Sequence, residues 1–156
     1  MTQKSFRMSV AVIAAFSLAA VPAMADKKIS RSHLPPAVEK TVQEQSKGAT
    51  IKGFATETEG GVLEYEAEMI VNGHSKDISI AKDGTLLEVE EEVSMSALPV
   101  GVQKALTAKA AGAKITKVES LTKRGKLVAY EAATLKGTKK GEIQVGPDGE
   151  KLAKSE

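Results

Sequence analysis

The pattern of apolar and polar residues has a period near four in two stretches of the chain, which predicts two amphipathic helices. Val38 and Val42 lie four residues apart among polar neighbours, and Val102 and Leu106 repeat that spacing in the second stretch. Serines that suit an N-cap and glycines that suit the residue after a last turn predict the limits of the helices. These are Ser32 and Gly48 for the first helix, and Ser96 and Gly112 for the second.

After each predicted helix, apolar residues alternate with polar ones, as they do in half-buried β-strands. The clearest example is Val62–Val71, in which Tyr65 and Met69 share one side with other apolar residues while three glutamates share the other. Asn72-Gly73, directly after it, is a strong hairpin signal. The pattern predicts strands near 50–58, 62–71, 76–81 and 86–93 after the first helix, and near 113–121, 127–136, 141–146 and 150–153 after the second.

The two halves of the chain are also similar in sequence. Eight residues of the first half recur 64 positions later, namely Ser32, Leu34, Pro35, Val38, Lys40, Gly48, Ala49 and Ile51. Similarity at this spacing is typical of supersecondary units that pack as a pair, because about 60 residues alone bury too little surface for a stable core. We therefore predict an α+β fold of two tandem repeats, 26–93 and 94–156, each with one helix packed on a four-stranded antiparallel meander. The two meanders can be separate or joined as one continuous sheet.

The order of these elements resembles the PepSY domain. Each half has a helix, a glycine stop, a short apolar strand, a strand with Tyr-Glu-Ala, and a strand pair around Asp-Gly. The matching residues are Tyr65-Glu66-Ala67 and Asp83-Gly84 in the first half, and Tyr130-Glu131-Ala132 and Asp148-Gly149 in the second. The tandem arrangement resembles the PepSY-like, β-lactamase-inhibitor-like proteins of bacterial periplasms. This resemblance implies an exported, non-catalytic module that binds or inhibits other proteins.

The N-terminal residues have the pattern of a signal peptide. Lys4 and Arg7 precede an apolar run, Ser9–Val21, and Ala23-Met24-Ala25 is a small-residue cleavage site. We predict that residues 1–25 are removed and that the remaining chain is periplasmic or secreted. Because no second apolar run follows, we expect no membrane contact after the leader is removed.

Charge is divided unequally between the halves. The formal net charge is +2, but it falls to zero without the leader, so it gives no reason to expect nucleic-acid binding. Residues 26–93 carry a net charge of −6, and residues 94–156 carry +6. Either these charges solvate two sheet faces, or they steer a basic partner, the second half of the chain, or a second copy of the chain onto the acidic half. Self-association is therefore one of the open alternatives.

Glutamates of the first half fall on the outward side of the predicted strands. We take five of them as candidate partner-binding residues, namely Glu64, Glu66, Glu68, Glu88 and Glu90. Tyr65 and Tyr130 fall on the inward side and are predicted to be core residues.

The exported part of the sequence offers little catalytic chemistry. It has no cysteine, and His33 and His74 do not have the spacing of metal ligands. Ser120 and Lys123 match an S-x-x-K pattern, but the serine ends a predicted strand rather than opening a helix. We therefore expect no enzyme, no catalytic residue, no cofactor and no metal-ligand set.

These observations predict a non-catalytic module that binds an unidentified periplasmic protein or peptide through the open face of its sheet. An inhibitor or modulator of a periplasmic enzyme is one form of this function. The alternative is a cation-responsive periplasmic protein that uses the acidic sheet face of the first half, because carboxylates suit hard cations such as Ca²⁺.

Overall fold

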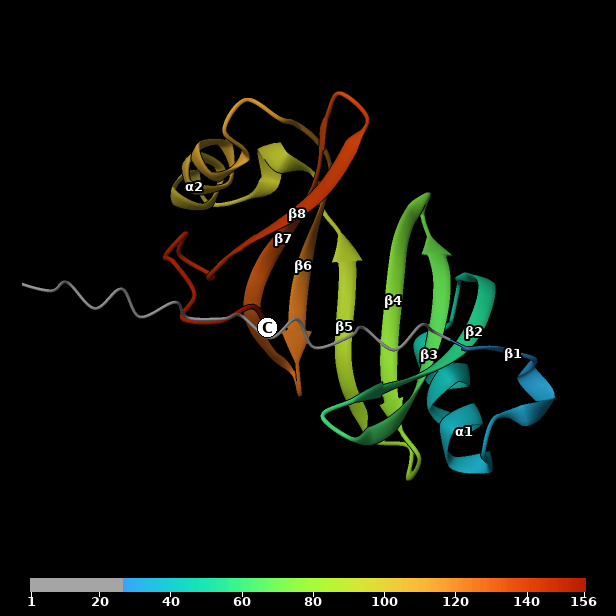
Figure 1. Cartoon of the computed structure of the whole chain (residues 1–156). Helices are drawn as coiled ribbons and strands as arrows, with labels where there is room; N and C mark the ends of the chain where they lie inside the picture. Colours follow the sequence, from blue (N-terminus) through green and yellow to red (C-terminus); the bar gives the residue numbers. More distant parts are fainter. Residues whose placement is uncertain (1–26) are drawn as a thin grey trace, which may run out of the picture.

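The described strands form one antiparallel sheet in which each strand pairs with the next along the chain. The computed structural model describes residues 27–156, and the predicted signal peptide, residues 1–25, lies outside them. In the described part the sheet has eight strands in the order β1 to β8 (Figure 1). The strands are β1 Lys27–Ile29, β2 Thr50–Glu59, β3 Val62–Val71, β4 His74–Ala81, β5 Leu86–Glu92, β6 Lys114–Lys123, β7 Lys126–Lys136 and β8 Lys139–Val145. The α-helices are α1 Pro36–Gln45 and α2 Val100–Ala110.

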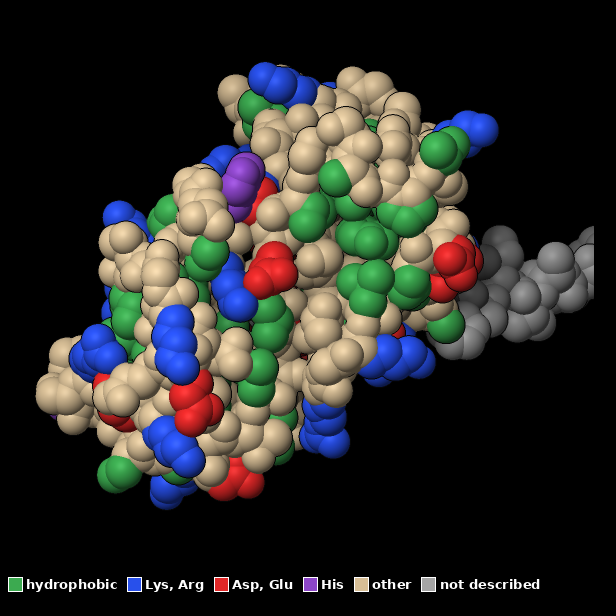
Figure 2. Space-filling model, turned by 180° about the vertical axis from the view of Figure 1, so that it is seen from behind, with side chains coloured by type: hydrophobic (Ala, Val, Ile, Leu, Met, Phe, Trp, Pro, Cys, Tyr) green, Lys and Arg blue, Asp and Glu red, His purple; other side chains and the backbone are tan. Residues whose placement is uncertain are grey.

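Both helices cover the same face of the sheet. Residues paired across an antiparallel ladder point to the same side, and Val89 of β5, which packs against the α1 core, pairs with Thr122 of β6. Val118 lies four residues before Thr122 on the same side of β6, and it packs in the α2 core. Figure 2 views the molecule from this helix-covered side, where hydrophobic side chains gather near the centre between more highly charged regions.

Each helix contributes two fully buried side chains to its own core. Val38 and Val42 of α1 pack against strands β2 to β4, and the buried residues there are Phe54, Tyr65, Ala67, Met69, Ile78 and Ile80. Val102 and Leu106 of α2 pack against strands β6 to β8, and the buried residues there are Val118, Ala132 and Val145. The helix spacing that the sequence predicted is confirmed, as is the inward position of Tyr65. Tyr130 is partly buried against the α2 core.

The helices begin later than the sequence predicted. Ser32 and Ser96 lie in short 3₁₀ turns, Arg31–His33 and Met95–Ala97, and the N-cap positions are Pro35 and Pro99. Neither proline side chain caps its helix with a hydrogen bond. The prediction that serines cap the helices is therefore wrong.

The predicted fold class is wrong, because the protein is not two repeats that each place a helix on a four-stranded meander. β5 pairs with β6 from Glu88↔Lys123 to Glu92↔Glu119, so the halves share one eight-stranded sheet. The first half contributes five strands, since β1 adds to β2, and the second contributes three. The strand predicted at 150–153 is absent from this part of the chain.

Two Asp-Gly turns hold the helices against the sheet. Gly84 has φ +89°, and a Cβ there would lie 2.8 Å from the carbonyl oxygen of Ala37 at the start of α1. Gly149 has φ +88°, and a Cβ there would lie 2.6 Å from the carbonyl oxygen of Gly101 in α2. Only glycine fits both the conformation and the close approach. The first turn leads into β5, whereas the chain after the second turn forms no strand at 150–153.

A β-bulge changes which leucine of β5 faces the helices. Strict alternation along residues 86–93 would place Leu87 and Val89 together on the helix side. The pairing shifts by one residue between Ser79 and Ile80, so Ile80 pairs with Leu86, and Leu86 packs against the α1 core. Leu87 therefore departs from this alternation, because the bulge inserts one extra residue.

Candidate functional site

The face of the sheet opposite the helices is rich in carboxylates. Strand register places on it Glu57, Glu59, Glu64, Glu66, Glu68, Asp77, Glu88, Glu90, Glu92, Glu119 and Glu131. Lys117 and Lys123 of β6 lie among them. We call this surface the open face. Acidic residues from β2 to β7 meet here because β5 pairs with β6 and so brings the two halves together.

The structure places all five candidate partner-binding residues on the open face, with different degrees of burial. Glu68 is exposed, and Glu66, Glu88 and Glu90 are partly buried. Glu64 is only 7 % exposed. The first three residues of the set lie on β3 and the other two on β5, with β4 between the strands.

Three carboxylates gather at the centre of the open face. Asp77, Glu90 and Glu119 each place a carboxylate oxygen within 4.8 Å of the others, and we call them the central cluster. Glu119 is 5 % exposed, and its Oε1 accepts hydrogen bonds from Lys117 Nζ at 2.7 Å and Ser75 Oγ at 3.3 Å. Lys117 therefore balances the charge of Glu119 through an ion pair. Asp77 and Glu90, the other two members of the cluster, have no such ion pair with a residue of 27–156.

Burial and like charges raise several pKa values in and beside the central cluster. Burial, followed by the charges of Glu88 and Glu131, raises the pKa of Glu90 to about 8. Burial is also the main cause that raises the pKa of Glu131 to about 7, although Gln144 Nε2 donates a hydrogen bond to Glu131 Oε2 at 2.6 Å. Burial raises the pKa of Asp77. A positive charge added to this surface would stabilise the ionised form of a carboxyl group whose pKa lies near 7.

The hairpin between β2 and β3 extends beyond the neighbouring strand. β4 pairs with β3 only as far as Glu64↔Ala81, whereas β2 and β3 continue to pair as far as Glu59↔Val62. We call residues 57–63 the β2–β3 arm. In Figure 1 the arm crosses in front of β4 toward β5. Its end reaches β6, because Lys123 Nζ lies 3.6 Å from Glu59 Oε1.

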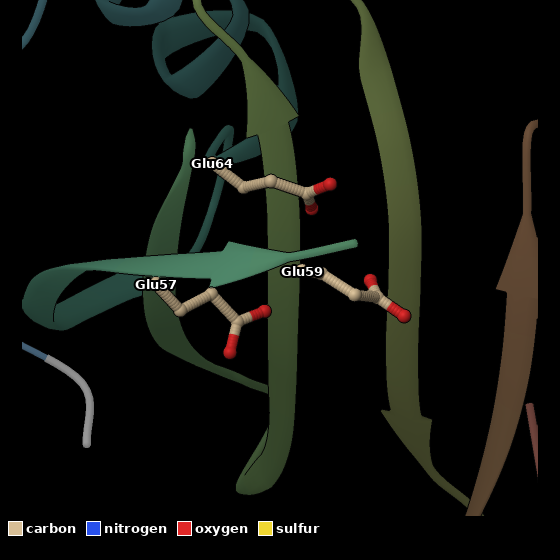
Figure 3. A group of neighbouring side chains, drawn as sticks. All are labelled: Glu57, Glu59 and Glu64. Atoms are coloured by element: carbon tan, nitrogen blue, oxygen red, sulfur yellow. The ribbon is translucent and has the colours of Figure 1, made fainter. Parts of the chain in front are cut away.

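A second group of carboxylates lies where the arm meets the sheet. Glu57 and Glu59 from β2 and Glu64 from β3 place carboxylate oxygens within 4.8 Å of one another, and we call them the arm cluster (Figure 3). Burial, followed by the charges of Glu59 and Glu57, raises the pKa of Glu64. Glu59 and Glu64 also line a cleft of about 140 Å³ whose other lining residues are Leu87, Glu88, Lys123 and Arg124.

The C-terminal segment crosses part of the open face. In Figure 1 the marked C-terminus lies in front of β6 and β7. The backbone N–H of Glu156 donates a hydrogen bond to Gln144 Oε1 at 2.9 Å. Leu121 and Ala129 are buried although strand register places them on the open face. The β6–β8 end of this face is therefore partly covered, whereas Glu68 on β3 is exposed.

The residues that the sequence analysis set aside do not form a catalytic group. Ser120 and Lys123 lie three residues apart on β6, so their side chains leave opposite faces of the sheet. His33 Nδ1 hydrogen-bonds with Ser30 Oγ at 2.7 Å, and His74 Nδ1 lies 3.7 Å from Glu92 Oε1. Both histidines are exposed.

Sequence reasoning missed the contribution of the second half to the open face. Glu119 and Glu131 were not candidates, yet they complete the group around Glu90. The inward position of Tyr130 implies an outward position for Glu131, so this signal was present in the sequence. The neighbourhood of Glu90 and Glu119 depends on the pairing of β5 with β6, for which the sequence carries no local signal.

No protein-family model and no curated protein matches the sequence. Solved structures do match. A Bacteroides eggerthii protein described as periplasmic has a TM-score of 0.61 at 17 % identity, over 76 % of this chain and 85 % of that chain. A BLIP-like protein from Bacteroides fragilis has a TM-score of 0.54 at 23 % identity, over 75 % and 83 %. A DUF2874 family protein from Bacteroides ovatus has a TM-score of 0.57 at 21 % identity, over 77 % and 85 %. The fold is thus similar to that of BLIP-like and DUF2874 proteins.

Neither helix in residues 27–156 is long and apolar enough to cross a membrane.

Proposed function

We propose that this protein is a non-catalytic binding module of the periplasm that takes a positively charged protein or peptide on its open face. The observation that supports this proposal is the crowding of partly buried carboxylates across β3 to β7, which raises the pKa of Glu90 to about 8. Glu64, Glu66, Glu68, Glu88 and Glu90 are the proposed contact residues.

The crowded negative charges of the open face favour the binding of cations. Each carboxylate removed from water beside another carboxylate raises the free energy of the folded protein. A lysine or arginine from a partner would lower that free energy by pairing with the ionised groups. The same field would steer a basic partner toward this face and weaken as salt is added.

The sequence and the similar structures support the proposed location and family. The predicted signal peptide and the similarity to a protein described as periplasmic support export to the periplasm. The similarity to a BLIP-like protein supports an inhibitor or modulator of a periplasmic enzyme as the form of the function. Membership of the tandem PepSY-like proteins remains part of this proposal.

Affinity capture from periplasmic extract with paired variants tests the proposal. The open-face variant carries Glu68→Gln and Glu88→Gln. The control carries Glu44→Gln in α1 and Glu91→Gln on the helix side of β5, and so has the same net charge. We expect the wild type and the control to retain the same basic protein at low salt and to release it at high salt, and the open-face variant to lose it. Equal retention by both variants, or no retained protein at low salt, would show the proposal to be wrong.

A second candidate function is a response to a divalent cation. The observation that favours it is the presence of two groups of three carboxylates, each with oxygens within 4.8 Å of one another. Carboxylate oxygens are the preferred ligands of hard cations. Calcium-dependent change in the melting temperature of the purified protein would support this function, and its absence would count against it.

A further inference from the structure

The arm cluster places carboxylates opposite and beside one another on two paired strands. Glu57 and Glu64 are direct partners across the β2–β3 ladder, and Glu59 is two residues from Glu57 on the same side. Like charges directly opposite each other destabilise a strand pair. The arm therefore places three negative charges together at the point where it turns over the sheet.

Glu64 is not paired directly with a cation in the described part of the chain. It is 7 % exposed and its side chain forms no hydrogen bond or ion pair within residues 27–156, and the opposing charge of Lys123 is outweighed by burial and by the charges of Glu59 and Glu57. The Nζ of Lys123 lies 3.2 Å from Glu88 Oε2 and 3.6 Å from Glu59 Oε1 instead. A buried carboxylate without a partner is costly unless it is protonated or meets a cation. Its position, within 4.8 Å of two further carboxylates, provides the ligands for a cation.

We propose that Glu57, Glu59 and Glu64 form a Ca²⁺ site that fixes the β2–β3 arm over the open face. This inference rests on the second candidate function and assigns it to particular residues. Ca²⁺ would link the two strands of the arm and hold its end close to β5 and β6.

The ligand set favours calcium over other common metals. The arm cluster has three carboxylates and no histidine or cysteine, so it lacks the nitrogen and sulfur ligands typical of zinc sites. Three carboxylates on adjacent strands do not provide the regular octahedron that Mg²⁺ requires, whereas Ca²⁺ accepts irregular sets of oxygens, including bidentate carboxylates. We expect weak binding, with a dissociation constant of about 0.1–1 mM, as is typical of extracellular calcium modules.

Lys123 makes the site responsive to the rest of the open face. Its ammonium group is shared between Glu59 and Glu88, so a cation that binds Glu59 competes with this contact. Removal of Lys123 should therefore tighten calcium binding. Because Glu88 is one of the proposed partner contacts, calcium at the arm cluster also changes the charge that a basic partner meets on β5.

Isothermal titration calorimetry with CaCl₂ on the protein purified from the periplasm tests the site. We expect one Ca²⁺ to bind the wild type, Glu64→Gln to weaken binding by about tenfold or more, and Lys123→Met to tighten it by about threefold or more. Glu68→Gln, an exposed glutamate on the same face, is the matched control and should change the affinity less than about twofold. Hydrogen exchange at residues 57–63 should slow with CaCl₂ in the wild type but not in Glu64→Gln.

Several outcomes would overturn the inference, and they separate it from the proposed functions. Unchanged calcium binding in Glu64→Gln, with loss in Asp77→Asn, would place the cation in the central cluster and leave a calcium response intact. No calcium binding by any of these proteins up to about 10 mM would reject both the site and the calcium response. Affinity capture of a basic protein would still test whether the open face binds a partner. Because Glu64→Gln removes a like-charge contact, we expect this variant to fold at least as well as the wild type.

Discussion

The raised pKa of Glu90 makes the stability of the fold depend on pH. In the folded protein this pKa is about 8, against an ordinary value of 4.5, and burial is the main cause. Below about pH 4.5 the carboxyl group is protonated in both the folded and unfolded states, so it causes no loss of stability. Between about pH 4.5 and 8 the folded state keeps a proton that the unfolded state releases, so stability falls as the pH rises. Above about pH 8 the loss is complete.

The size of this loss follows from the two pKa values. Each unit between the folded and unfolded pKa corresponds to about 1.4 kcal/mol, so a fully isolated group would cost about 5 kcal/mol at high pH. Glu90 is partly buried and keeps some contact with water. Screening by that water reduces the expected loss to about 2–3 kcal/mol. Glu90→Gln, which resembles the protonated group and cannot ionise, should remove it.

Urea unfolding at pH 5 and pH 9 measures the effect. We expect Glu90→Gln to be more stable than the wild type by about 2–3 kcal/mol at pH 9 and by less than about 1 kcal/mol at pH 5. Glu68→Gln, which removes an exposed carboxylate from the same face, should change stability by less than about 0.5 kcal/mol at both values. If the wild type and Glu90→Gln differ by the same amount at pH 5 and pH 9, the electrostatic reasoning for the open face is wrong.

Three further predictions concern the fold and its charges. Glu131→Gln should stabilise the protein above about pH 7 by about 1–2 kcal/mol, since burial raises the pKa of Glu131 to about 7, and the same urea series measures this. Gly84→Ala should destabilise by about 3 kcal/mol because its Cβ would meet the Ala37 carbonyl. Gly73→Ala, with φ +88° and open space around it, should cost only about 1 kcal/mol. Leu106→Ala should cost about 3 kcal/mol, and unfolding should remain a single transition because both cores share one sheet; two separate transitions in calorimetry would contradict this.

The elements that the sequence predicted best are those set by local pattern. Val62–Val71 is a strand with the limits that its alternation indicated, and Asn72-Gly73 turns it back into β4. The buried pairs on both helices were also predicted from their spacing alone. In each case residues within about ten positions of one another determine the outcome, so no knowledge of distant contacts is needed.

The features that the sequence did not predict depend on contacts between distant segments. β5 and β6 pair across a helix and a 3₁₀ turn, β1 is only three residues long, and residues 150–153 form no strand. Alternation placed the five candidate glutamates on the open face, yet it could not show that Glu64 is buried. That burial results from the arm turning over the sheet, beyond the end of its pairing with β4.

Crosslinking mass spectrometry on intact periplasm tests most directly whether the open face binds a partner. Amine-reactive reagents report on Lys117 and Lys123 among the carboxylates of this face, and on Lys40 and Lys104 on the two helices. We predict crosslinks from Lys117 or Lys123 to one basic protein, lost when Glu68→Gln and Glu88→Gln are combined. Crosslinks that come from Lys40 and Lys104 instead, and that persist in this double variant, would contradict the account.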